Sequence, residues 1–204
     1  MIQLRFAKFI SYAFHPLLMP SYFLLFLFKS NTYLSMIVPS YYQMIICILV
    51  FFSTFLLPLI NLLLLYKNGT ISSLQMHSKE ERKTPYFINL ICCASTYYLL
   101  QQAKVPPLIT VVFIGASVSL LMALLINLKW KISAHMIGVG GVTGALIAIA
   151  IKIQFDYTLP IVVLILLSGM IGSARMLLKA HNLQEIYSGY FLGLATQLIT
   201  LLVL

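Results

Sequence analysis

Long uninterrupted apolar runs constrain this chain more than any other feature of its sequence. Of its 204 residues, 61% are hydrophobic and 8% are charged. A helix needs about 20 apolar residues to cross the hydrocarbon core of a bilayer. Seven segments approach or exceed this length, covering about 9–28, 41–66, 86–102, 106–127, 132–152, 158–178 and 185–204. The sequence therefore predicts an all-α, polytopic membrane helical bundle of about six to seven transmembrane helices, built as a single integral membrane domain over residues 1–204.

The first segment has the charged start of a signal peptide, because Arg5 and Lys8 precede it. However, His15-Pro16 and Pro20 interrupt the apolar run, and no clear small-residue cleavage site follows it. We therefore expect this segment to be retained as a membrane helix.

The strongly basic composition narrows the choice of partners. Lys and Arg outnumber Asp and Glu 13 to 4, for a formal net charge of +9. In a soluble protein this excess suggests nucleic acid, but no hydrophilic domain is available here to bind it. The expected partners are anionic lipid headgroups or a phosphorylated lipid substrate. Cys47, Cys92 and Cys93 lie in apolar runs and are odd in number, which indicates packing residues without disulfides.

Polar residues gather in three junctions between the apolar segments, at residues 67–84, 129–135 and 175–185. These junctions follow the second, fourth and sixth segments. Successive crossings alternate sides, so all three junctions are predicted to lie on one face of the membrane, together with the N-terminus.

The third junction carries the most chemistry. Glu185 is the last of only four acids, and a carboxylate in so apolar a chain is energetically unfavourable without a function. Helical spacing of four predicts that Glu185 orients the imidazole of His181, with Arg175 six residues upstream as a phosphate ligand. One alternative is a helix end stabilised by its dipole. Another is a metal pair completed by His135.

The second junction offers Lys131, Ser133 and His135 as candidates, because a hydroxyl and backbone N–H groups at a helix start bind anions and an imidazole can transfer a proton. Trp130 and the glycines of 138–144 are better explained as an interfacial belt and a close-packing helix.

The first junction offers Lys79, Arg82 and Lys83. For Arg82, phosphate binding and an ordinary positively charged cytoplasmic loop are both open, while the loop explains Lys83 better. His77 and His15 are expected to be structural or interfacial.

Together the junctions resemble the type 2 phosphatidic acid phosphatase superfamily of membrane lipid phosphatases, which is related to vanadium haloperoxidases. The family motifs are K-x6-R-P, P-S-G-H and S-R-x5-H-x3-D. The third motif matches in spacing at Arg175, His181 and Glu185, with Glu in place of Asp. The second keeps Ser133 and His135 but lacks its Pro and Gly.

The first motif departs from the family pattern. With Arg82 as its arginine, Gln75 stands at the place of the lysine, Lys83 stands at that of the proline, and Pro85 falls two residues late. We expect Lys79 or Lys131 to supply the missing cation.

The resemblance covers about residues 75–190 and implies an active site at the ends of several helices on one membrane face. It implies that His181 attacks phosphorus to form a phosphohistidine, that Glu185 orients it, and that His135 protonates the leaving oxygen. Arg175 and Ser133, with the basic residues of the first junction, would bind the phosphoryl oxygens without a metal or other cofactor. Such roles predict a bell-shaped dependence of rate on pH.

The predicted activity is therefore hydrolysis of a lipid phosphate, such as phosphatidic acid, phosphatidylglycerophosphate or a polyprenyl diphosphate. A phosphotransferase, a lipid-phosphate transporter or binding protein, and an inactive family member are the alternatives. The resemblance implies the bacterial cytoplasmic membrane. Orientation stays open, because ten of the thirteen Lys and Arg residues lie on the motif face, which the positive-inside rule places in the cytoplasm, whereas many bacterial relatives act on the outer face.

Overall fold

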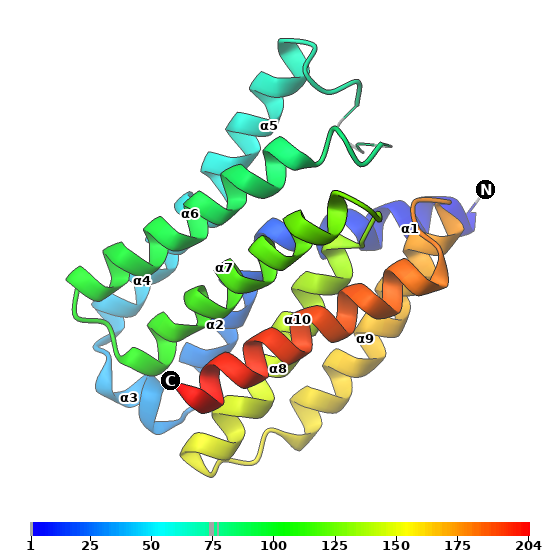
Figure 1. Ribbon diagram of the computed structural model, residues 1–204. Helices are drawn as coiled ribbons and strands as arrows, with labels where there is room; N and C mark the ends of the chain where they lie inside the picture. The colour runs from blue at the N-terminus through cyan, green and yellow to red at the C-terminus, as the bar shows by residue number, and fades with distance from the viewer. Residues whose placement is uncertain (1, 74–75, 77) are drawn as a thin grey trace.

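The computed structural model of the protein describes residues 2–73, 76 and 78–204, which form helices and no strand. Gln75 and His77 lie outside the described residues. Six helical stretches in this part of the chain are long and apolar enough to cross a membrane, at Ile2–Lys29, Ser40–Lys67, Pro107–Asn127, Ala134–Ile153, Thr158–Leu177 and Leu183–Val203. The prediction of an all-α, polytopic membrane bundle is confirmed (Figure 1).

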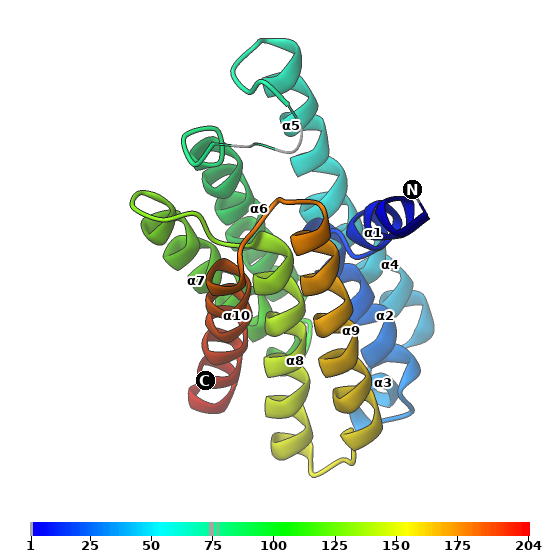
Figure 2. The same ribbon diagram turned by 90° about the vertical axis from the view of Figure 1, so that its right-hand side faces the viewer.

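The first stretch is not the single helix that the sequence predicts over 9–28. It consists of α1 (Ile2–Ala13), a short 3₁₀ turn η1 (Pro16–Leu18) and α2 (Met19–Lys29). The break falls at His15, whose backbone is extended because the ring of Pro16 disfavours helical geometry in the preceding residue. As a result α1 lies across the end of the bundle and packs against α9, instead of continuing the line of α2 (Figure 2).

The second stretch is continuous, as predicted over 41–66. Helix α4 (Ser40–Phe51) passes through one π-helical turn, η2 (Phe52–Leu56), into α5 (Leu57–Lys67). The widened turn comes directly before Pro58, which has no N–H for the regular helical hydrogen bond. A five-residue helix, α3 (Tyr33–Ile37), links this stretch to α2.

The third predicted segment, 86–102, is the helix α6 (Lys83–Gln102). It has the length of a membrane span but is less apolar than the six stretches above. It packs along α7 (Pro107–Asn127), and the two are joined at Pro106-Pro107.

Helices α8 (Ala134–Ile153), α9 (Thr158–Leu177) and α10 (Leu183–Val203) complete the bundle, close to the predicted segments. Glycines hold α8 and α10 in direct backbone contact. A Cβ atom on Gly140 would collide with the carbonyl of Tyr190, and one on Gly193 would collide with that of Ile137. The close packing predicted for the helix that contains the glycines of 138–144 is thus made with another helix of the same chain.

The three polar junctions meet at one end of the bundle, as predicted (Figure 1). Arg82 donates to the carbonyl of Ile132 at 3.2 Å, which joins the first junction to the second. Lys131 donates from Nζ to the carbonyl of Ala180 at 2.9 Å, which joins the second to the third. Helix α1 lies at the same end, so the predicted position of the N-terminus is also confirmed.

Candidate functional site

The third junction turns sharply between α9 and α10. Asn182 is extended, and its side chain accepts a hydrogen bond from the backbone N–H of Glu185 at 2.9 Å, which caps α10. Nδ1 of His181 and Oε2 of Glu185 are 2.6 Å apart, and both residues are 8% exposed. The predicted contact is present, but the expected helical spacing is wrong, because His181 precedes the helix. The cap, not a shared helix face, brings the pair together.

This contact determines which nitrogen of His181 has a lone pair available. A carboxylate only accepts, so Nδ1 of His181 carries the hydrogen and Nε2 of the neutral ring is unprotonated. Burial, and after it the neighbouring charges of Arg82, Arg175 and Lys131, together lower the pKa of His181 to about 2. The imidazole is therefore neutral throughout the ordinary pH range, so the acidic limb of the predicted bell-shaped rate profile should lie at lower pH.

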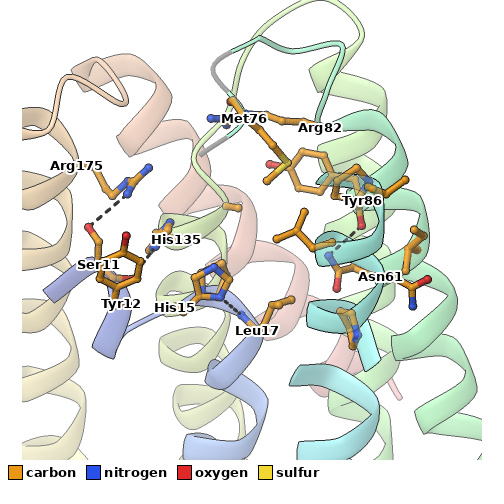
Figure 3. Close-up of a pocket in the computed structure, with 18 of the residues that line it drawn as sticks. Ser11, Tyr12, His15, Leu17, Asn61, Met76, Arg82, Tyr86, His135 and Arg175 are labelled. Atoms are coloured by element: carbon orange, nitrogen blue, oxygen red, sulfur yellow. Dashed lines mark hydrogen bonds between the residues drawn. The ribbon is translucent and has the colours of Figure 1, made fainter. Parts of the chain in front are cut away.

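Helix α1 joins Arg175 of α9 to His135 of α8. The hydroxyl of Ser11 accepts from Nη1 of Arg175 at 3.3 Å, and its backbone carbonyl lies 3.1 Å from Nε2 of His135 (Figure 3). Because a carbonyl accepts, Nε2 of His135 carries a hydrogen. Nε of Arg175 is buried and has no hydrogen-bond partner among the described residues. This guanidinium therefore retains donor capacity for a ligand.

The second arginine of the site, Arg82, directly precedes α6 and is 7% exposed. Its Nε donates to the carbonyl of Met76 at 3.0 Å, and its Nη1 to that of Ile132. Burial lowers the pKa of Arg82, with opposing contributions from Tyr86 and Glu185. Arg82 and Arg175 lie on opposite sides of the site (Figure 3). A buried cation that donates to backbone carbonyls favours an anionic ligand.

The remaining three predicted residues, Lys131, Lys79 and Ser133, lie near this site but do not line its cavity. The charge of Lys131 is close enough to His181 to lower the pKa of that imidazole. Burial, and after it the charge of Arg82, lower the pKa of Lys131 itself. Lys79 donates to the carbonyl of Leu128 at 3.3 Å and belongs to a structural link between two junctions. The hydroxyl of Ser133 is buried with no partner in the described chain, and its backbone N–H donates to the carbonyl of Glu185 at 3.2 Å.

A cavity of about 160 Å³ brings four of the eight predicted site residues together. They come from different elements of the bundle and are Arg82, His135, Arg175 and His181. Glu185 lies behind His181. The walls also include residues that the sequence reasoning did not assign to a site, among them Lys8, Ser11, Tyr12, His15, Asn61, Tyr86 and Asn89.

The sequence contains a pattern that could have predicted the cavity residues of the first segment. Lys8, Ser11, Tyr12 and His15 follow the i, i+3, i+4, i+7 pattern, which places polar groups on one face of a helix. His15 has the structural role expected of it, because its Nδ1 accepts from the N–H of Leu17 at 3.4 Å at the start of η1. Its ring also borders the cavity, with a centroid 5.5 Å from that of His135.

The metal alternative requires a third ligand beside His181 and Glu185. Within residues 2–73, 76 and 78–204, no three His, Cys, Asp or Glu side chains are grouped to hold an ion. In particular, Nε2 of His135 is directed to Ser11.

No protein-family model, curated protein or solved structure matches this chain. The family resemblance is therefore a hypothesis that depends on the motif residues alone.

Proposed function

We propose that this chain is an integral membrane phosphatase that removes phosphate from a lipid phosphate or lipid diphosphate without a metal ion. The observation that carries the proposal is the buried His181–Glu185 pair at a cavity flanked by Arg82 and Arg175. A transferring phosphoryl group spreads negative charge over three oxygens, so fixed cations in a partly dehydrated site stabilise its transition state.

In the proposed reaction, Nε2 of His181 attacks phosphorus while the bond from phosphorus to the leaving oxygen breaks. Glu185 accepts a hydrogen bond from Nδ1–H throughout, so the positive charge that develops on the ring is compensated. Water then attacks the phosphohistidine, the bond from phosphorus to Nε2 breaks, and phosphate leaves. Arg82 and Arg175 bind the phosphoryl oxygens in both steps.

His135 is proposed to act as the imidazolium: it gives its Nε2 proton to the leaving oxygen, and the neutral ring then takes a proton from the attacking water. Its Nε2 hydrogen contacts the carbonyl of Ser11. Proton transfer through this atom therefore requires that the leaving oxygen replace Ser11 as acceptor, which links substrate binding to the position of α1.

The first experiment measures phosphate release by the purified protein in detergent with EDTA, on lysophosphatidic and phosphatidic acids, phosphatidylglycerophosphate and polyprenyl diphosphates. His181→Ala should abolish turnover. Gln184→Ala, an exposed change in the same junction, should not. Absence of turnover on all substrates, with lipid-phosphate binding intact in the wild type and in His181→Ala, would replace this proposal with a binding or transport function.

A second experiment isolates the proton donor. His135→Ala should slow release from lipid phosphates by about a hundredfold or more. Its activity on p-nitrophenyl phosphate, whose leaving group needs no proton, should stay close to that of the wild type. Equal losses on both substrates would refute this role for His135.

A further inference from the structure

A second cavity, of about 130 Å³, adjoins the site on the side of the membrane interior. We call it the membrane cavity. It shares wall residues with the first cavity, namely Pro16, Leu17, Tyr86, Asn89 and Ala134. The two cavities therefore share a wall at the start of α8, next to His135.

The membrane cavity extends far down the bundle. Along α8 its walls run from Ala134 to Ala145. Eleven helical steps of about 1.5 Å correspond to a depth of about 16 Å. One leaflet is about half of a hydrocarbon core roughly 30 Å thick, so this depth is close to the length of one lipid chain.

Two buried side chains limit the membrane cavity on the side of α7 and α10. Phe113 of α7 and Gln197 of α10 line it there and are 1% and 4% exposed, and we call them its floor. Nε2 of Gln197 donates to the carbonyl of Val112 at 2.9 Å, which holds the side chain in place. Gly115 makes room for it, because a Cβ there would lie 2.5 Å from Oε1. On this side, a chain that enters from the phosphate site would meet these two side chains.

We propose that the membrane cavity holds one hydrocarbon chain of the substrate while its phosphate lies between Arg82 and Arg175. The substrate class is then lipid phosphates with a single chain, and α7 and α10 limit its length. This inference rests on the proposed function. The wall shared with the cationic site supports it, as does the mostly apolar lining, which includes Phe23, Val142 and Leu120.

The test fills the cavity near its floor. Ala116 lines the membrane cavity, whereas Ala94 of α6 is exposed on the outside of the bundle. Ala116→Leu should lower kcat/KM for oleoyl lysophosphatidic acid about tenfold, as expected if roughly two methylenes lose their buried position. Activity on the octanoyl analogue should change less than about twofold, which also shows that the variant is folded. Ala94→Leu should leave both activities unchanged.

Three results would overturn the inference: equal losses on both chains, no loss on either, or faster turnover of dioleoyl phosphatidic acid than of the single-chain lipid by the wild type. A binding assay separates this inference from the catalytic proposal, using non-hydrolysable oleoyl and octanoyl phosphonates. Tighter oleoyl binding that Ala116→Leu removes supports the cavity even where no lipid is hydrolysed. Equal affinities in a protein that releases phosphate reject the cavity and retain the phosphatase.

Discussion

Removing the charge of Glu185 while keeping its shape tests the central pair of the site. In Glu185→Gln the amide oxygen still accepts from Nδ1 of His181, so the geometry at 2.6 Å is largely preserved. What is lost is the charge that compensates the ring in the transition state. A charge-assisted hydrogen bond contributes about 1.5–3 kcal/mol. Opposite unit charges about 4 Å apart interact by roughly 4 kcal/mol at an effective dielectric constant near 20.

These two limits predict a decrease in kcat between about tenfold and about a thousandfold, at roughly one factor of ten per 1.4 kcal/mol. The assay is phosphate release at saturating substrate, with thermal unfolding to monitor the fold, because the change also removes a charge from the start of α10. The matched control is Glu80→Gln, an exposed loss of the same charge at the same end of the bundle. A value of kcat within threefold of the wild type for Glu185→Gln, a threshold of about 0.7 kcal/mol, would refute charge compensation by this carboxylate.

Three further predictions concern packing, phosphate affinity and pH. Gly193→Ala should destabilise the protein by about 1–3 kcal/mol in thermal unfolding, because its Cβ meets a backbone carbonyl; Gly169→Ala, with open space around it, should stabilise it by up to about 1 kcal/mol, and equal effects would contradict the close packing. Lys131→Ala should raise KM about fivefold, the effect of roughly 1 kcal/mol from a partly exposed charge, whereas Lys79→Ala should not; the reverse order would place the missing cation at Lys79. Because the pKa of His181 is lowered from 6.5 to about 2, the unfolded chain binds a proton in this interval that the folded chain does not. The contribution of His181 to the free energy of unfolding should therefore be fully present above pH 6.5 and decrease in acid by up to about 1.4 kcal/mol per pH unit. The dependence of this free energy on pH should be weaker in His181→Gln. An unchanged slope in unfolding experiments would contradict a buried neutral ring.

The sequence predicted the bundle well because lipid leaves few alternatives for the backbone. Apolar runs of about 20 residues must be helices in a bilayer, and alternating crossings require polar junctions after even-numbered segments to share a face. The contacts of Arg82 with Ile132 and of Lys131 with Ala180 confirm that the three junctions meet at one end of the bundle. Neither inference depends on side-chain detail.

The errors arose where local backbone geometry decides the structure. Periodicity did not predict that the chain turns at His15 and lays α1 across the bundle, although Pro16 marks the place. Spacing alone predicted the contact of His181 with Glu185 but assigned it to a helix face, whereas the extended backbone of Asn182 produces it. Spacing also could not separate Lys131 from Lys79, because which carbonyl a flexible amine reaches depends on the fold of two distant loops.

The glycine contacts between α8 and α10 have a consequence for how the protein can move. Backbones in van der Waals contact cannot slide past each other by fractions of a turn without collision, since each glycine fits beside one particular carbonyl. Helix α8 begins next to His135, and α10 begins next to His181, so the separation of the two imidazoles is fixed by a rigid pair of helices. Conformational adjustment to a ligand must then come from the other walls, α1 and the α5–α6 pair. The distance between the two histidines therefore limits the size of the group that can bind between them, and the other helices adjust to that group.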